Sequence, residues 1–168
     1  MTDTTLPDEA TAAVLARVDA GQTVTIAEIG GLFAADRDAF GTTTLGLRWD
    51  TLHRDRVTAH LDVGPTHQQP YGIVHGGVWC SVIESLASIG AALRVASSGR
   101  YAVGVSNSTD FLRAHRVGRI DAVATPIHAG RLQQLWVAEL TRPEDGKVVA
   151  RGQVRLQVID PSQLGDGS

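Results

Sequence analysis

The feature that most constrains the fold is a run of seventeen residues, 77–93, whose single charged side chain is Glu84. The run has helical periodicity, because at 100° per residue its large apolar side chains fall within an arc of about 80°. This apolar face consists of Val78, Val82, Leu86, Ile89 and Leu93. A surface helix carries several charges opposite its apolar face, and this one carries Glu84 alone. We therefore predict a helix that is buried on both faces.

The surroundings of Glu84 on this helix are small side chains. They are Gly77, Cys80, Ser81, Ala87, Ser88 and Ala91. An ionised group inside a protein or at a subunit contact is costly unless it is paired or used. Glu84 is therefore a candidate catalytic acid or base.

Alternating apolar and polar residues predict strands on both sides of the helix. We expect two strands before it, 43–49 and 56–63, and a meander of four after it, 101–106, 119–127, 132–141 and 147–159. Pro126 lies within one of these runs and predicts a bulge or an edge position there. One helix cannot cover both faces of such a sheet. The expected fold is α+β, with an antiparallel sheet of five to six strands wrapped around one long central helix, and its uncovered surfaces favour self-association.

The chain is expected to form one domain with two appendages. Residues 41–160 carry the strands and the helix, and residues 161–168 form a loose C-terminal tail. Residues 1–40 form an N-terminal extension with a short helix over 7–19, which Gly21 ends.

Composition excludes several classes of function. A net charge of −3 without a basic run argues against a nucleic-acid partner. The single Cys80 rules out an internal disulfide framework, and no N-terminal segment has the pattern of a signal peptide, so we expect a cytoplasmic protein. Run 77–93 is slightly short for a membrane span and contains Glu84, so no membrane partner is expected. The six scattered His residues have no metal-ligand spacing.

The start of the helix, His75-Gly76-Gly77, is a candidate site for a carbonyl oxygen. Backbone N–H groups at a helix start are unpaired and lie at the positive end of the dipole, which suits a developing oxyanion. Ser88 follows Glu84 by one turn and can reach it. Glu84 lies about 12 Å of helix rise from Gly76, so a partner chain would bring a carboxylate to that carbonyl. By itself the triplet is more simply a tight turn, with Glu84 a structural carboxylate, but its combination with the uncharged helix favours catalysis.

The segment Gln69-Pro70-Tyr71-Gly72-Ile73-Val74-His75-Gly76-Gly77, followed by Glu84 and Ser88, resembles the hotdog-fold acyl-CoA thioesterases. The similarity is greatest to the PaaI-type and 4-hydroxybenzoyl-CoA thioesterase branch that uses Glu, and it covers about residues 40–159. The resemblance implies a hotdog fold and thioester hydrolysis without a metal or redox cofactor. It also implies a homodimer or a homotetramer with active sites between two subunits.

The resemblance implies a role for each catalytic residue. Glu84 would be the nucleophile or general base toward the thioester carbonyl. The N–H of Gly76 would polarise the carbonyl oxygen and Gln69 would help to position it. His75 would shape the turn, and Ser88 would orient the hydrolytic water.

The residues expected to contact substrate or CoA are Gly77, Ser81, Phe111, Arg113 and Arg131. The resemblance places the two arginines near the CoA, and their fork-shaped side chains suit its phosphates. The alternative for each is an ordinary surface arginine. Relatives often carry Asn-His or His-His shortly before the position of Arg113, whereas this chain has Asp110, Phe111 and Leu112. Phe111 therefore favours an apolar or aromatic acyl group.

The leading hypothesis is an acyl-CoA thioesterase that hydrolyses an aromatic or a short- to medium-chain acyl-CoA to free acid and CoA. One alternative is a non-catalytic module that binds acyl-CoA, although such sensors usually carry a DNA-binding domain that residues 7–40 do not resemble. Another is a hotdog dehydratase or hydratase, which places its His and acidic residue differently and lacks the counterpart of Gln69.

Overall fold

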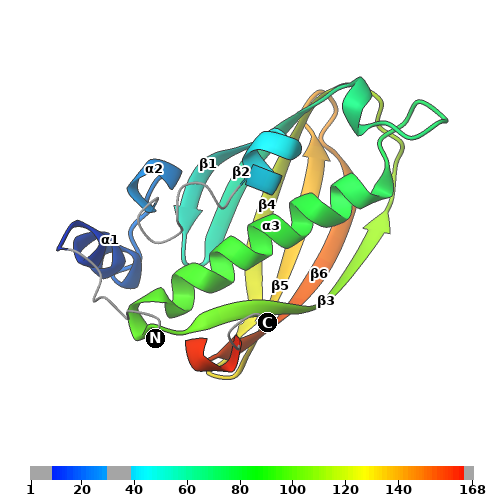
Figure 1. Ribbon diagram of the computed structural model, residues 1–168. Helices are drawn as coiled ribbons and strands as arrows, with labels where there is room; N and C mark the ends of the chain where they lie inside the picture. The colour runs from blue at the N-terminus through cyan, green and yellow to red at the C-terminus, as the bar shows by residue number, and fades with distance from the viewer. Residues whose placement is uncertain (1–8, 30–38, 165–168) are drawn as a thin grey trace.

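The computed structural model describes residues 9–29 and 39–164 and contains a six-stranded antiparallel sheet that curves around one long helix (Figure 1). The helices are α1 (Glu9–Asp19), α2 (Ile26–Ile29) and α3 (Gly76–Val95). The strands are β1 (Leu47–His53), β2 (Arg56–Val63), β3 (Tyr101–Phe111), β4 (Gly118–Ala129), β5 (Gln133–Arg142) and β6 (Lys147–Ile159). This arrangement confirms the predicted hotdog fold.

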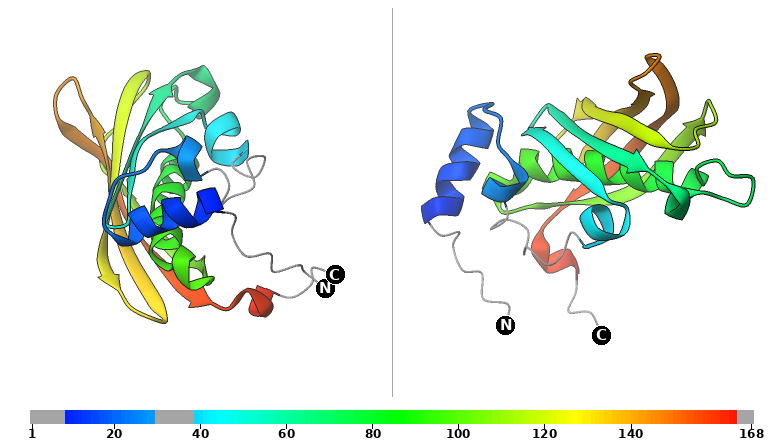
Figure 2. Two further views of the ribbon diagram at one scale, coloured as in Figure 1. Left: turned by 90° about the vertical axis from the view of Figure 1, so that its left-hand side faces the viewer. Right: turned by 90° about the horizontal axis from the view of Figure 1, so that it is seen from above.

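The strand order in the sheet is β1-β2-β4-β5-β6-β3. Strands β4, β5 and β6 form the predicted meander, but β3 does not belong to it. Although β3 precedes β4 in the chain, it pairs with β6 at the far edge of the sheet. The helix causes this separation, because the chain crosses the concave face along α3 and returns along the opposite edge (Figure 2).

Strands β2 and β6 have the predicted bounds, and the bulge at Pro126 is present within the interior strand β4. The prediction that the first strand begins at residue 43 is wrong, because Ala39–Thr44 form a π-helical turn, η2. The backbone N–H of Leu45 closes this turn on the carbonyl of Phe40 at 2.9 Å. Strand β3 is also longer than predicted, since a bulge beside Gly104 interrupts its alternation and hides its continuation to Phe111.

Helix α3 packs against the sheet with a face that differs from the predicted stripe. Of the predicted stripe, Val82, Leu86 and Leu93 are buried as expected, whereas Val78 and Ile89 are only partly buried. The buried face extends instead to Trp79, Ile83 and Ala87. The cause lies at Gly90, where a Cβ atom would come within 2.4 Å of the Trp136 ring. This close approach turns the Trp79 side of the helix toward the sheet. The opposite side is only partly buried in the single chain, so the prediction of burial on both faces is not met there.

The segment Gly76–Ser98 has the length and hydropathy of a membrane span, with a mean hydropathy of 1.4. Its packing along the concave face of the sheet accounts for the same composition, because the core helix of a globular domain is equally apolar.

The described part of the N-terminal extension packs at the C-terminal end of α3, where α1 contacts both α3 and the following turn (Figure 1). Gly21, at φ +69°, ends this segment as predicted, and Val24 then pairs with Leu52 at the edge of β1. The start of the predicted first helix at residue 7 lies outside the described residues. The domain boundaries at residues 40 and 160 stay a prediction.

Candidate active site

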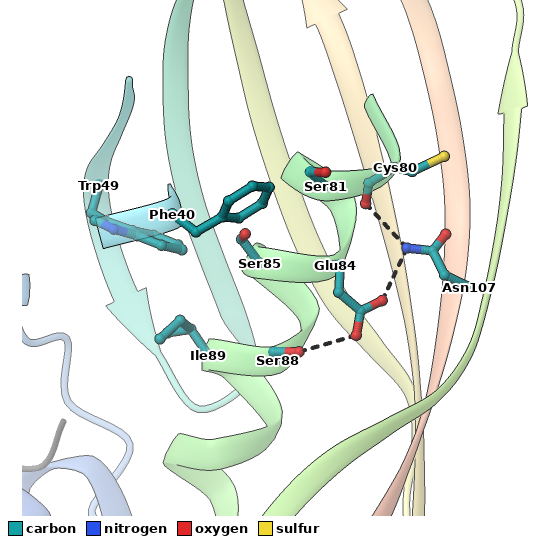
Figure 3. Close-up of a pocket in the computed structure, with 9 residues that line it drawn as sticks. All are labelled: Phe40, Trp49, Cys80, Ser81, Glu84, Ser85, Ser88, Ile89 and Asn107. Carbon is teal, nitrogen blue, oxygen red and sulfur yellow. Dashed lines mark hydrogen bonds between the residues drawn. The ribbon is translucent and has the colours of Figure 1, made fainter. Parts of the chain in front are cut away.

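Glu84 lies midway along α3, and its carboxylate sits between this helix and strand β3 (Figure 3). The hydroxyl of Ser88 donates to its Oε1 at 3.3 Å, so the predicted contact is present. The side-chain amide of Asn107 donates to its Oε2 at 3.0 Å. Two donors, one from the helix and one from the strand, therefore hold the orientation of the carboxylate.

Asn107 is a site residue that the sequence analysis missed. Its Nδ2 also donates to the carbonyl of Cys80 at 3.1 Å, and its Oδ1 accepts from the Thr109 hydroxyl at 2.7 Å. The β3 bulge turns Asn107 to the helix side of the sheet, although simple alternation from Gly104 would point it away. The unbroken polar run 106–110 inside an otherwise extended segment was the available signal.

Gly104 gives the Glu84 carboxylate its room against β3. A Cβ atom at this position would lie 2.5 Å from Oε1 of Glu84, closer than any real contact allows. The backbone of β3 can therefore approach the carboxylate only because this residue has no side chain.

An open cavity of about 530 Å³ surrounds Glu84 on the outer side of α3. Its lining residues are Phe40, Trp49, Cys80, Ser81, Glu84, Ser85, Ser88, Ile89 and Asn107. Of the predicted site residues, Glu84, Ser81 and Ser88 come together here. We call this space the carboxylate cavity.

The start of α3 is capped by His75, whose Nδ1 accepts the backbone N–H of Gly77 at 2.9 Å. The prediction that both glycine N–H groups are unpaired is therefore wrong for Gly77, because the imidazole takes that donor. The N–H of Gly76 has no hydrogen-bond partner in the part of the chain that the structure describes. One backbone donor at the positive end of the helix thus stays available to a ligand.

A second open cavity, of about 480 Å³, lies at this helix start. Its lining residues are Gln69, Ile73, Val74, His75, Gly76, Gly77, Trp79, Phe111, Leu112, Arg113, Ala114 and His115. The Phe111 ring lies against Gly76, where a Cβ atom would meet it at 2.6 Å. We call this space the glycine cavity, and it collects six predicted residues: Gln69, His75, Gly76, Gly77, Phe111 and Arg113.

A tight loop fixes Gln69 at the rim of the glycine cavity. Its backbone N–H donates to Ile73 at 2.8 Å, and its carbonyl accepts from Gly72 at 2.9 Å. Gly72 has a φ of +68°, a conformation that favours glycine. The backbone of Gln69 is therefore ordered while its amide side chain is left for a ligand.

The two predicted phosphate-binding arginines lie far apart in the single chain. Arg113 is exposed at the glycine cavity, and its Nη1 donates to the carbonyl of Val148 at 2.6 Å. Arg131 lies in the turn between β4 and β5, at the other end of the sheet, where its carbonyl accepts from Arg100. Strand β4 separates them because it starts near the end of β3 and runs the length of the sheet.

The carboxylate cavity and the glycine cavity share no lining residue. Glu84 and Gly76 are separated by two helical turns, about 12 Å of rise, which is too far for both to act on one carbonyl group. Within a single chain the two halves of the predicted site are therefore apart. Among the described residues, no group of three or more His, Cys, Asp or Glu side chains is placed to hold a metal ion.

Comparison with known proteins gives consistent matches. A family model described as the thioesterase superfamily matches residues 71–149. A Mycobacterium tuberculosis protein named as an esterase is 48% identical over 118 residues, which cover 69% of this chain and 84% of that protein. The 1,4-dihydroxy-2-naphthoyl-CoA hydrolase of Escherichia coli is 29% identical over 68% of this chain and 83% of its own. The crystal structure of a Haemophilus influenzae thioesterase superposes with a TM-score of 0.67 at 29% identity, covering 76% of this chain and 86% of that one.

Proposed function

The chain belongs to the thioesterase superfamily, and from this premise we propose that it hydrolyses an acyl-CoA thioester to a free acid and CoA. The observation that carries the proposal is the Glu84 carboxylate, which two hydrogen bonds hold at the wall of an open cavity. Relatives with thioester substrates in their names support it, among them the 1,4-dihydroxy-2-naphthoyl-CoA hydrolase of E. coli.

In the proposed reaction the thioester carbonyl binds at the start of α3. The free N–H of Gly76 donates to the carbonyl oxygen, and the helix dipole stabilises the negative charge that develops there. Gln69 positions the carbonyl from the rim of the glycine cavity. His75 keeps the turn rigid by capping Gly77, which leaves the Gly76 donor aimed outward.

Glu84 supplies the basic oxygen, either by attacking the carbonyl carbon or by removing a proton from an attacking water. Ser88, which already contacts Glu84, orients this water. If water attacks, its oxygen bonds to the carbonyl carbon, the carbon–sulfur bond breaks, and the leaving CoA thiolate takes up the proton that Glu84 removed. If Glu84 attacks, the carbon–sulfur bond breaks to give an acyl–Glu84 anhydride. The water then hydrolyses this anhydride, which releases the free acid, restores the carboxylate and supplies the proton for the CoA thiolate. These steps need no metal or redox cofactor.

We also propose that two chains share each active site through strand β3. This strand is at the edge of the sheet, and Tyr101 and Val105 on it are 50% and 53% exposed. Antiparallel pairing of two β3 strands about a two-fold axis would run the two α3 helices in opposite directions. The glycine cavity of one chain would then approach the carboxylate cavity of the other. A pair of such dimers would give a tetramer.

The remaining assignments follow from this mechanism. Arg113 stands at the rim of the glycine cavity and retains guanidinium donors beyond its bond to Val148, which suit a CoA phosphate. Arg131 lies at the opposite end of the sheet, so it would act on a CoA bound mainly by another subunit. We propose a cytoplasmic location, since acyl-CoA is the substrate.

The test is thiol release from a panel of aromatic and aliphatic acyl-CoAs by the purified protein. We expect turnover of at least one of them, and Glu84→Gln should lower kcat by about 10²–10⁴-fold, because it removes the basic oxygen at nearly constant volume. Glu144→Gln, in an exposed turn, is the matched control and should keep full activity. Tight acyl-CoA binding without thiol release would instead favour a binding module, and retention of more than about a tenth of kcat in Glu84→Gln would remove Glu84 from the mechanism.

A further inference from the structure

We propose that Phe40 and Trp49 form an aromatic subsite of the carboxylate cavity that selects acyl groups with a planar ring over straight alkyl chains. This inference rests on the proposed thioesterase function, whose acyl group it specifies. Both residues line the same cavity as Glu84, and they lie on the other side of α3 from Asn107 (Figure 3). Neither belongs to residues 71–149, so the family match does not account for them.

The Phe40 ring is exposed although its backbone is fixed. The side chain is 57% exposed and lines the carboxylate cavity. Its carbonyl accepts the N–H of the buried Leu45, whose own carbonyl contacts Nε2 of His67 at 3.0 Å. The turn therefore places the ring at the cavity with more than half of its surface accessible to a ligand.

Trp49 provides the second wall. It lies on β1 and packs against the hydrophobic core while part of its surface lines the carboxylate cavity. A partly buried indole on a strand keeps its orientation. Together with Ile89 on α3, the two rings make the apolar end of a cavity whose other end is the Glu84–Asn107 pair.

A path of small side chains connects the carboxylate to these rings. At 100° per residue, the cavity-lining positions from Glu84 to Ile89 follow one another around the outer face of α3 over an arc of about 140°. Their order around the helix is Glu84, Ser88, Ser81, Ser85 and Ile89. Three serines thus form the floor between the reacting centre and the apolar end, and no bulky side chain on the helix interrupts it. An acyl group whose carbonyl is at Glu84 can lie flat across this floor.

The chemistry of the walls and floor favours a ring. Aromatic pairs in offset or edge-to-face contact gain more than their buried area alone provides. The serine hydroxyls can in addition donate to and accept from polar substituents on such a ring. The cavity therefore suits a benzoyl- or naphthoyl-type acyl group.

The test compares kcat/KM for naphthoyl-CoA and octanoyl-CoA in the full-length wild type, in Phe40→Leu and in Phe40→Tyr. The wild type should prefer naphthoyl-CoA. Phe40→Leu should lower the naphthoyl-to-octanoyl ratio about three- to tenfold, because it keeps an apolar side chain and removes the ring. Phe40→Tyr retains the ring and should keep the ratio within about twofold. A wild type that prefers octanoyl-CoA, or a ratio unchanged in Phe40→Leu, would overturn the subsite.

Binding to the Glu84→Gln variant separates this inference from the proposed function. Absence of thiol release from every acyl-CoA would defeat the thioesterase proposal alone. Equilibrium dissociation constants of the same two acyl-CoAs for Glu84→Gln, with and without Phe40→Leu, do not depend on turnover. We expect Glu84→Gln to bind naphthoyl-CoA more tightly than octanoyl-CoA, and we expect the added Phe40→Leu to remove most of this difference. If Glu84→Gln binds the two acyl-CoAs equally well, with or without Phe40→Leu, the aromatic subsite is rejected whether or not the protein is an enzyme.

Discussion

The side-chain amide of Asn107 lies 3.0 Å from Oε2 of Glu84 and joins strand β3 to helix α3 at the carboxylate itself. Thr109 holds the other end of the same amide at 2.7 Å, so the amide orientation is set from the strand. The direction in which Glu84 presents its oxygen atoms therefore depends on β3 as well as on the helix that carries it.

Removal of this amide should affect catalysis more than substrate binding. Asn107→Ala is expected to lower kcat about tenfold with KM nearly unchanged, because the carboxylate loses one of its two fixed contacts. Asn107→Asp keeps the shape of the side chain but puts a second acceptor opposite Oε2, so it should lower kcat at least as much as Asn107→Ala. Steady-state kinetics of both variants measures kcat and KM separately. An unchanged kcat in both variants would show that Asn107 does not position Glu84.

Gly104→Ala tests the close approach of β3 to the carboxylate. The new Cβ atom would lie 2.5 Å from Oε1, so Glu84 must move away and lose its contacts with Ser88 and Asn107. We expect kcat to fall about 10²-fold, because the base is no longer correctly placed. The circular dichroism spectrum should be preserved, which would show that the fold is intact. Gly64→Ala is the control, because a Cβ atom there meets nothing within 4 Å. Equal activities of the two variants would contradict the role given to Gly104.

Mixing two inactive variants tests the shared site. Gly76→Val drives a side chain into the Phe111 ring and disables the glycine cavity, while Glu84→Gln disables the carboxylate cavity. Random pairing makes half of the dimers hybrid, each with one intact site, so about a quarter of wild-type activity should return. Activity is measured after mixing, and native mass spectrometry verifies subunit exchange. Verified exchange without recovery, or an active monomer in light scattering, would rule out sharing between chains.

Gln69 and its neighbour Gln68 form a matched pair for mutation. The Gln68 amide donates to the carbonyl of Arg116 at 2.7 Å and is structural, whereas the Gln69 amide faces the glycine cavity. Gln69→Ala should lower kcat/KM about tenfold without changing Tm, because one contact to the carbonyl is lost. Gln68→Ala should lower Tm and leave kcat of the folded protein unchanged. The reverse pattern would assign the carbonyl contact to Gln68.

The ion pair between Arg17 and Glu28 predicts an acid-sensitive contact in the N-terminal segment. The Arg17 guanidinium, and then the N–H and hydroxyl of Thr25, lower the pKa of Glu28 from 4.5 to about 2. A lowered pKa contributes stability that is present above pH 4.5 and is lost as the pH falls toward 2. The pair is exposed, so the effect on global stability should be small. A carboxyl titration of Glu28 followed by NMR should give a midpoint near 2, and a midpoint near 4.5 would show that the pair does not form in solution.

The predictable parts of the fold are those in which one face of an element is uniformly buried. Strand β2 alternates strictly, with Val57, Ala59 and Leu61 all buried, and its bounds were predicted correctly. The predicted strand at 101–106 is shorter than β3 for two reasons. The inner face of β3 meets the Glu84 carboxylate, so its residues there are polar, and a bulge breaks the alternation of its side chains. The position of β3 beside β6 is a long-range pairing that no local pattern encodes.

The candidate site shows the same division. Helical spacing placed Ser88 next to Glu84, because the two residues are one turn apart on a regular element. The backbone N–H of Gly77 was expected to be unpaired, but it donates to the His75 ring, which turns back onto the start of the helix. Sequence spacing does not reveal the direction of that ring. Asn107 was missed because its contact with Glu84 depends on the bulge and on the strand order.

The separation of the carboxylate and glycine cavities has a genetic consequence under the proposed sharing. A chain that carries both Glu84→Gln and Gly76→Val spoils both sites of any dimer that it enters, because it withholds the base from one site and the carbonyl donor from the other. A chain that carries either substitution alone leaves its wild-type partner one working site. In a cell that expresses both alleles, the double mutant would therefore be dominant over the wild type, while each single mutant would only dilute it.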